Sequence, residues 1–270
     1  MPDGRQETID EMADWWKTSI SDIGPGVIRL RGHDIAELID DWSFVSVIWL
    51  MVTGAKATPW QSRLLEASLV ASVDHGPQAP SIAAARMAAT CGIGINNAIA
   101  TGANLLGDNH GGAGQQCVEM LYEIRHAELD GIDPQAAVRE VVARWKEKKR
   151  YLPGFGHRFH PIDPRRDPLL SLIDQAAAAG EVSGDFARIA RAVEAHLSEG
   201  RPHPIPMNID GATAAIYAEL GVEPQMARGL FVLARSVGIF AHAYEEMRSG
   251  ARIKGPMPKS VLPRYVPNPG

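Results

Sequence analysis

The stretch QMARGLFVLARSVGIFAHAYEEMRSG, residues 225–250, decides the fold class of this chain. Its large apolar side chains recur every three or four residues, which is the spacing of one face of an α-helix and predicts a single buried stripe. That stripe consists of Leu230, Leu233, Val237, Phe240, Tyr244 and Met247. Gly250 follows the last periodic residue, where glycine commonly ends a helix. A long, buried helix is therefore expected near the end of the chain.

The same helix carries a charge that burial makes costly. Phe231, Val232 and Ile239 make its first half apolar on nearly every side, so Arg235 is expected to be buried. A buried guanidinium is unfavourable unless an anion pairs with it. Arg235 is therefore a candidate anion-binding residue, and His242 lies two turns further along the same face.

Most of the remaining chain also favours helix. Alanine-rich segments such as residues 81–92 and 186–197 contain strong helix formers and end near Gly or Pro. The only convincing β pattern is GPGVIRLRGHDI, residues 24–35, where apolar and charged residues alternate between glycines. The sequence predicts an all-α fold with a short N-terminal β-hairpin.

Composition bounds the class of protein. The chain has 270 residues, 45% of them hydrophobic, and a formal net charge of −5, which disfavours a general nucleic-acid binder. Its first residues are acidic and polar, unlike a secretory leader, and its longest apolar run, residues 44–52, is too short to cross a bilayer. Two unpaired cysteines, Cys91 and Cys117, suit small buried side chains and exclude a disulfide framework. We therefore expect a cytoplasmic protein without nucleic-acid or membrane partners.

Three candidate residues lie at helix ends, and each has a purely structural alternative. His75 follows a helix, where it fits either a favourable charge on the helix dipole or a binding group. His110 precedes a helix whose dipole disfavours imidazolium, so a neutral ring can donate a hydrogen bond; a turn histidine without a role is the alternative. Asp210 begins a helix, which a capping role alone explains, whereas a catalytic carboxylate would need burial to raise its pKa.

The stiff loop 152–168, LPGFGHRFHPIDPRRDP, concentrates imidazole and cation. His157 and His160 followed by Asp163 have the spacing of a partial metal site, but the neighbouring arginines would repel a cation and no second ligand cluster is evident. A basic cluster surrounds the start of the loop: Lys146, Lys148, Lys149, Arg150 and Arg158. In a net acidic chain, this cluster suits a phosphorylated cofactor, with a solvated helix face as the alternative.

Taken together, these stretches resemble the landmarks of the citrate synthase superfamily. The similar motifs, in chain order, are DHGP (74–77), NHGGA (109–113), PGFGHR (153–158) with DPR (163–165), NIDG (208–211) and LARSVG (233–238). Within that superfamily the chain looks closest to citryl-CoA lyases and to the C-terminal citryl-CoA-cleaving module of ATP-citrate lyase. The resemblance implies a large helical domain formed by residues 1–111 and 216–270, with a smaller helical domain, residues 112–215, inserted into it.

The resemblance also implies roles for particular residues. His110, His157 and Asp210 match the catalytic triad, in which one histidine stabilises an enolate, the other serves the substrate hydroxyl, and the aspartate moves a proton at carbon. His75, Arg165 and Arg235 match positions that hold a dicarboxylic oxo-acid. The residues expected to bind the CoA phosphates are Arg158, Lys148, Lys149 and Arg150. The coenzyme A thioester is then a substrate, no metal or redox cofactor is implied, and a homodimer with composite active sites is expected.

One departure from the family pattern affects the expected substrate. Where a partner-subunit arginine precedes a proline in citrate synthases, this chain has Gly255 before Pro256, which leaves Arg252 and Lys254 as substitutes. The leading hypothesis is a citryl-CoA lyase that cleaves citryl-CoA reversibly to acetyl-CoA and oxaloacetate. A citrate or 2-methylcitrate synthase, which also hydrolyses the thioester, is the nearest alternative. A non-catalytic CoA-binding subunit is the alternative from another class.

Overall fold

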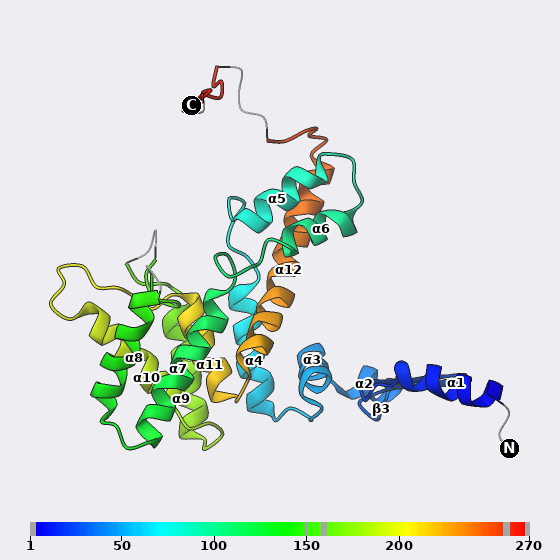
Figure 1. Ribbon diagram of the computed structural model, residues 1–270, viewed down its shortest axis with the longest axis horizontal. Coiled ribbons are helices and arrows are strands. Elements are labelled where there is room, and N and C mark those ends of the chain that lie inside the picture. Colours follow the sequence, from blue (N-terminus) through cyan, green and yellow to red (C-terminus); the bar gives the residue numbers. More distant parts are fainter. Residues whose placement is uncertain (1–3, 149–150, 158–160, 256–259, 268–270) are drawn as a thin grey trace. The chain divides into compact units, whose positions relative to one another are not determined.

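Helices make up nearly all of the regular secondary structure of the described residues, as predicted (Figure 1). The structure is a computed structural model that describes residues 4–148, 151–157, 161–255 and 260–267. The helices of the described residues are α1 (Gly4–Trp15), α2 (Ile35–Asp41), α3 (Phe44–Thr53), α4 (Pro59–Ser72), α5 (Pro80–Ala89), α6 (Ile95–Ala103), α7 (Ala113–Leu129), α8 (Pro134–Lys148), α9 (Arg166–Ala178), α10 (Asp185–Ser198), α11 (Ile209–Glu219) and α12 (Pro224–Arg248). None of the helices in these ranges combines the length and apolarity needed to cross a membrane.

The predicted N-terminal hairpin is present and gains a short third strand. Strand β1 (Ser21–Gly24) pairs antiparallel with β2 (Val27–Leu30), which in turn pairs with β3 (His33–Asp34). The turn between β1 and β2 uses Gly26 at a φ of 76°, a backbone conformation that side chains other than glycine rarely adopt. Asp34 then caps α2 by accepting a hydrogen bond from the Ala36 amide at 2.9 Å.

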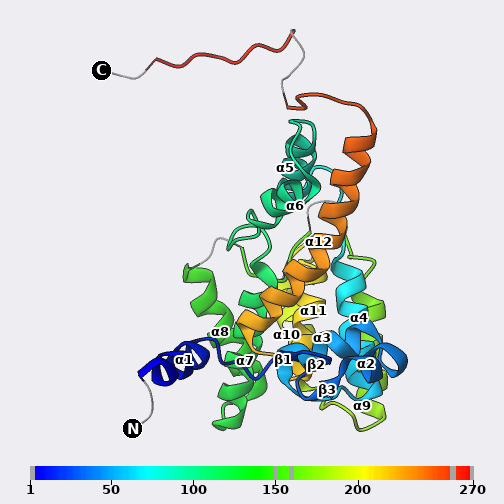
Figure 2. The same cartoon turned by 90° about the vertical axis from the view of Figure 1, so that its right-hand side faces the viewer.

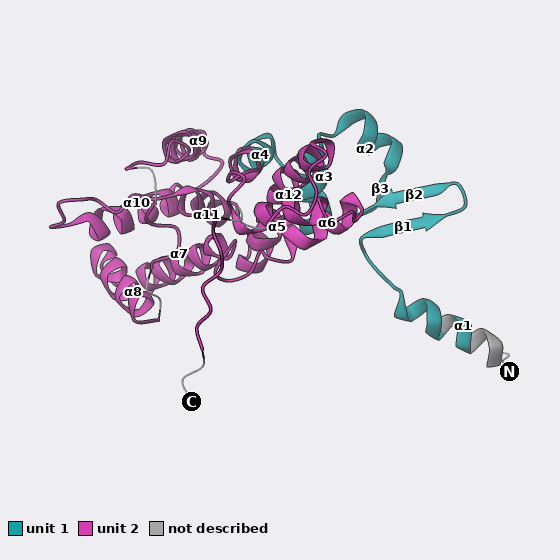
Figure 3. Cartoon of the chain, turned by 90° about the horizontal axis from the view of Figure 1, so that it is seen from above, with its two compact units in different colours: residues 1–66 teal, residues 67–270 magenta. Residues whose placement is uncertain are grey.

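The chain divides into two compact units, residues 1–66 and 67–270 (Figure 3). The smaller unit holds the hairpin and the first three helices, and every candidate site residue lies in the larger one. The inserted domain expected at residues 112–215 lies wholly within the larger unit and stays a prediction.

The larger unit is organised around α12, which packs against α5, α6 and α7, while α7 in turn packs against α8, α10 and α11 (Figures 1 and 2). Small residues make the α5–α6–α12 contact close. A Cβ at Gly102 would lie 2.7 Å from both the Ile239 Cγ2 atom and the Ser81 carbonyl oxygen, so only glycine fits there. Ile82 and Ile239, both fully buried, fill this part of the core.

The stripe predicted to be buried on α12 is wrong for most of its members. Leu230 is buried, but Leu233, Val237, Phe240 and Tyr244 have exposed fractions between 43% and 56%. The side of α12 that faces the core is built instead largely from small residues, including Ala234, Gly238 and Ala243. Periodicity identified an apolar face correctly but cannot tell a face covered by the chain itself from one left open.

Candidate active site

The four candidate stretches meet at one cavity of about 650 Å³. His75 comes from the turn after α4, His110 from the turn before α7, and His157 from the loop after α8, while Asp210 lies in the first turn of α11. All four of these side chains line the cavity. Residues separated by 135 positions in the chain thus share one small volume, because α4 ends near it and α5, α7 and α11 begin near it.

Two glycines bring the His157 loop onto the start of α11. Gly154 has a φ of 83°, and a Cβ there would lie 2.6 Å from Cys117 Sγ and 2.9 Å from the Gly211 Cα. Asn208 links the two segments by two hydrogen bonds. Its backbone N–H donates to the Gly154 carbonyl at 3.0 Å, and its side-chain Nδ2 donates to the Gly156 carbonyl at 2.8 Å. The close glycine contact and these hydrogen bonds fix His157 relative to the first turn of α11.

Asp210 is not the N-cap of α11, which corrects its simplest structural explanation. The cap is Asn208, whose Oδ1 accepts hydrogen bonds from the amides of Asp210 at 2.9 Å and Gly211 at 3.3 Å. Asp210 therefore has no capping duty that would explain its position. Burial raises the pKa of the Asp210 carboxyl above its ordinary value, and nearby Asp163 adds to the rise, while Arg235 and Arg165 oppose it.

The hydrogen bonds of His110 define its tautomer. The Ser81 amide donates to His110 Nε2 at 3.2 Å, and Ser81 Oγ lies 2.9 Å from the same nitrogen. Because a backbone amide can only donate, Nε2 is the acceptor and the ring proton of neutral His110 is on Nδ1. Burial lowers the pKa of His110, and the charge of Arg235 lowers it further, so the neutral form is favoured. Ser81 was not identified from the sequence, because its role depends on a contact across 29 residues.

Arg165 is oriented by a fully buried carboxylate. Asp163 Oδ1 accepts from Arg165 Nε and Asp163 Oδ2 from Arg165 Nη2, both at 2.9 Å, while Arg165 Nη1 donates to the Ala71 carbonyl at 3.2 Å. One N–H on each terminal nitrogen stays uncommitted within the described chain, so the end of the guanidinium can still receive a carboxylate. Asp163 also accepts from the Ile209 amide at 3.0 Å, which links Arg165 to the start of α11.

Arg235 is buried, as predicted, and its ordinary counter-ion is missing from the described residues. It is 3% exposed, and its Nε donates to the Ser72 carbonyl at 2.9 Å while the guanidinium lies 4.8 Å from the centre of the Phe231 ring. No carboxylate within the described residues forms an ion pair with it. Burial lowers the pKa of Arg235, which is the cost of a charge held out of water without a close partner.

The cavity has a positive electrostatic character. The pKa of His75 is lowered first by burial and then by the charges of Arg235, Arg165, His157 and His110. Each of these groups disfavours a further positive charge at His75. An anion near His75 would be attracted to the guanidinium groups of Arg235 and Arg165, which is the property a dicarboxylate site requires.

The predicted CoA-phosphate residues are only partly described. Arg158, Lys149 and Arg150 lie outside the described residues, as does His160 of the metal interpretation. Lys148 is exposed at the end of α8 and lines a separate pocket of about 410 Å³ with Trp145 and Arg228.

The two proposed substitutes for the partner arginine differ in what holds them. Lys254 Nζ lies 3.0 Å from Glu246 Oε1, and the Lys254 amide donates to Thr90 Oγ1 at 2.8 Å, so this lysine is committed within its own chain. Arg252 is exposed. Of the two side chains, Lys254 has its ammonium group paired with Glu246, whereas Arg252 has its guanidinium open to solvent.

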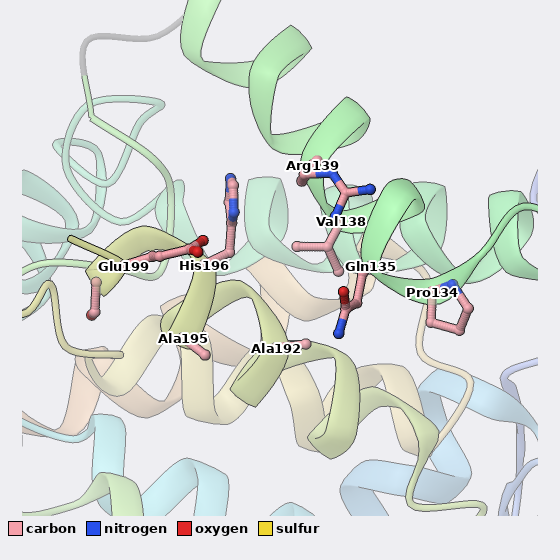
Figure 4. A pocket seen from close by; sticks show the side chains of 9 residues that line it. Pro134, Gln135, Val138, Arg139, Ala192, Ala195, His196 and Glu199 are labelled. Atoms are coloured by element: carbon pink, nitrogen blue, oxygen red, sulfur yellow. The ribbon is translucent and has the colours of Figure 1, made fainter.

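Among the described residues, no cluster of three or more His, Cys, Asp or Glu side chains has the arrangement of a metal site. A groove of about 550 Å³ between α8 and α10 is lined by Arg139, His196 and Glu199 over Val138 and Ala192, and it contains none of the predicted site residues (Figure 4).

The sequence matches a known family model over most of its length. The model described as citrate synthase, C-terminal domain, matches residues 51–256. Among curated proteins, the citrate synthase of Acidithiobacillus ferridurans is 29% identical over 224 residues, which cover 80% of this chain. The chain spans 55% of the length of that relative.

Solved structures give matches over nearly the whole chain. The citryl-CoA lyase of Hydrogenobacter thermophilus superimposes with a TM-score of 0.79 at 29% identity, covering 94% of this chain and 96% of that one. The ATP citrate lyase of Methanothrix soehngenii, solved with citrate and coenzyme A, superimposes with a TM-score of 0.77 at 21% identity, covering 97% of this chain and 44% of that one. The match to the ATP citrate lyase shows a shared fold. The match to the citryl-CoA lyase covers nearly all of both chains.

Proposed function

The chain belongs to the citrate synthase family, and from this premise we propose that it is a citryl-CoA lyase, which cleaves citryl-CoA reversibly to acetyl-CoA and oxaloacetate. The observation that carries the proposal is the meeting of His110, His157 and Asp210 at one cavity, together with a buried Arg235 that forms no ion pair within the described residues. The superposition of the citryl-CoA lyase of Hydrogenobacter thermophilus over 94% of this chain supports the lyase within the family.

The proposed chemistry moves one proton at oxygen and one at carbon. His157 takes the proton of the tertiary hydroxyl as the carbon–carbon bond breaks, so the hydroxyl carbon becomes the ketone of oxaloacetate. The electron pair of that bond passes into the thioester and forms the enolate of acetyl-CoA. His110 donates the hydrogen bond from Nδ1 that stabilises the enolate oxygen. Asp210 then delivers its proton to the enolate carbon, and solvent exchange restores the starting protonation states.

The raised pKa of Asp210 supports its part in this scheme. A general acid must hold its proton when the enolate forms, and an aspartate at its ordinary value of 3.8 would be almost fully ionised at neutral pH. Burial shifts the balance toward the protonated form. In the condensation direction the same carboxylate removes the methyl proton, and its elevated basicity then favours that step.

The oxo-acid carboxylates are assigned to the arginines and His75. Arg235 supplies a buried guanidinium that lacks a carboxylate, and Arg165 supplies the free end of a guanidinium held by Asp163. Two carboxylates placed against these groups would replace the missing counter-charge. His75 then holds the oxo-acid from the turn after α4.

The remaining expectations belong to the same proposal. Lys148, Lys149, Arg150 and Arg158 face the CoA phosphates, and no metal or redox cofactor takes part. The enzyme is a cytoplasmic homodimer. Gly255 stands where citrate synthases have the partner-subunit arginine, and Arg252 of a second copy substitutes for that arginine. Closure of residues 112–215 over the substrate would exclude water from the enolate.

A citrate or 2-methylcitrate synthase is the second candidate. The curated relatives that match this chain are named citrate synthases, and the triad serves condensation as well as cleavage. A synthase hydrolyses the thioester after condensation, whereas a lyase releases acetyl-CoA intact. The fate of the thioester therefore separates the two.

The deciding experiment supplies purified protein with synthetic citryl-CoA in the absence of ATP. Oxaloacetate is followed through coupled malate dehydrogenase, and acetyl-CoA and free CoA are quantified in the same samples. Equal amounts of oxaloacetate and acetyl-CoA are expected. Citrate with free CoA would establish the synthase instead, and CoA binding without any turnover would establish the non-catalytic subunit. The Asp210→Ala variant is expected to bind CoA esters and to lose turnover.

A further inference from the structure

Three residues of α12 contact three successive residues of the segment that leads into His75. Arg235 Nε donates to the Ser72 carbonyl at 2.9 Å, and the Gly238 amide donates to the Val73 carbonyl at 3.1 Å. One turn further, His242 Nε2 lies 3.2 Å from Asp74 Oδ1. The segment therefore follows α12 residue by residue up to the position before His75.

The contact at Gly238 is too close for a side chain. A Cβ at this position would clash with the Val73 carbonyl oxygen and would lie 2.9 Å from Asp74 Oδ1. The backbone of residues 73 and 74 is therefore seated directly against the helix. Its lateral position is set by the two polar side chains on either side of the glycine, Arg235 and His242.

Asp74 links this seat to the turn that carries His75. Its Oδ2 accepts from the Gly76 amide at 3.0 Å, which closes a short turn around His75. Its Oδ1 is buried, and the polar group that faces it from α12 is His242 Nε2 at 3.2 Å. Loss of His242 would leave that buried oxygen without its polar contact, which is costly for a carboxylate.

The orientation of the His242 ring is fixed from its other side. Arg86 Nη1 lies 3.3 Å from His242 Nδ1, and a guanidinium can only donate, so Nδ1 accepts and the proton of the neutral ring is on Nε2, facing Asp74. Arg86 is itself held by the buried carboxylate of Glu246, which lies 2.6 Å from its Nε. The bracing residues come from α5 and α12, which pack side by side (Figures 1 and 2).

We propose that His242 is a positioning residue for the oxo-acid site, acting through Asp74 to hold the His75 turn against α12 at Gly238. The inference rests on the proposed function, because it takes His75 to contact the oxo-acid. His242 itself touches no substrate in this proposal. Its contribution is the placement of His75 relative to Arg235. Arg235 lies two turns before His242 on α12.

The test compares His242→Leu with His242→Gln, whose amide nitrogen can donate to Asp74 from about the place of Nε2. In the Leu variant, the KM for oxaloacetate is expected to rise about tenfold, because the polar contact between His242 Nε2 and Asp74 Oδ1 is lost, while the KM for acetyl-CoA stays unchanged. The kcat is expected to fall less than the KM rises, since the catalytic triad is untouched. The Gln variant is expected to recover most of the loss. His126→Leu, at an exposed position of α7, is the matched control and is expected to match the wild type.

A second measurement needs no turnover. Amide hydrogen exchange over residues 73–78 is expected to accelerate in His242→Leu and Asp74→Asn but not in His126→Leu, because the first two remove the seat of the turn. Unchanged exchange in both variants overturns the inference, as does an equal rise in both KM values or a Gln variant no better than Leu. A wild type that does not turn over citryl-CoA or oxaloacetate overturns the proposed function instead, and the exchange data then decide this inference alone.

Discussion

Asp210 combines two demands at the scale of a single residue: it must hold a proton, and the charges of two nearby arginines, Arg235 and Arg165, favour its ionised form. Burial outweighs the arginines, and the net effect is a raised pKa. A carboxyl group whose pKa is raised by burial costs folding free energy at neutral pH. Such a cost is common where chemistry, and not stability, has selected the residue.

Replacing Asp210 with Asn should therefore reduce turnover and raise stability together. Below pH 3.8 the carboxyl is protonated in both folded and unfolded states, so wild type and variant should be equally stable. As pH rises, the unfolded chain ionises first, so the wild type loses stability until the folded-state pKa is passed. At pH 7 the variant is expected to be more stable by about 1 kcal/mol, with turnover lower by about 10²–10⁴-fold. Urea unfolding at several pH values measures the first effect, and a variant less stable than wild type at pH 7 would contradict it.

The sequence predicted the residues of the cavity better than their supports. His110 and His157 line the cavity, and the short motifs that contain them pointed to both residues because each motif combines a histidine with glycine neighbours. The role of Ser81 depends on a contact with His110 that exists only in the folded chain. The paired hydrogen bonds between Asp163 and Arg165 depend on a side-chain orientation that sequence spacing does not encode. The N-cap of α11 was misassigned by two residues, because Asn208 and Asp210 are both favoured at that position and sequence alone does not rank them.

At the scale of elements, the site depends on how closely the His157 loop approaches α11. A Cβ on Gly211 would clash with the Gly154 carbonyl oxygen and would lie 2.6 Å from Met207 Cγ. These are a backbone atom and a buried side chain, so neither can easily move aside. The close contact between the His157 loop and α11 therefore requires glycine at residue 211. The sequence motif contains this glycine but does not show why it is needed.

Gly211→Ala is expected to destabilise the protein by about 1–3 kcal/mol through overpacking and to lower kcat by moving His157 away from Asp210. Gly229→Ala is the matched control, because Gly229 is also helical and nothing lies within 4 Å of the added Cβ. The control should be neutral or stabilised by about 0.5–1 kcal/mol, as alanine is the better helix former. Thermal unfolding and steady-state rates measure both variants, and equal behaviour of the two would show that the loop does not need this approach.

At the scale of the whole molecule, an unpaired Arg235 should make stability depend on the ligand. A dicarboxylate that binds only the folded protein stabilises it by about 2.7 kcal/mol at a hundredfold excess over its Kd. Arg235→Met keeps the volume and removes the charge, so the variant without ligand should be at least as stable as wild type while oxaloacetate no longer raises its Tm. Arg248→Met, at the exposed end of α12, should retain the full shift. A Tm that oxaloacetate raises equally in wild type and Arg235→Met would exclude Arg235 from the site.

The exposed apolar face of α12 makes the last prediction, which concerns assembly. Leu233, Val237, Phe240 and Tyr244 form a continuous helical stripe that this chain leaves open, and such a patch is unusual on a protein that remains a monomer. In the proposed homodimer, a second copy covers it. Light scattering should then give a dimer for wild type and a monomer for Val237→Glu, because a buried, unpaired carboxylate opposes association. Leu129→Glu, at an exposed position of α7, should remain dimeric. If the active site is composite, Val237→Glu should also lose turnover at protein concentrations where it is monomeric, whereas a fully active monomer would show that each chain carries a complete site.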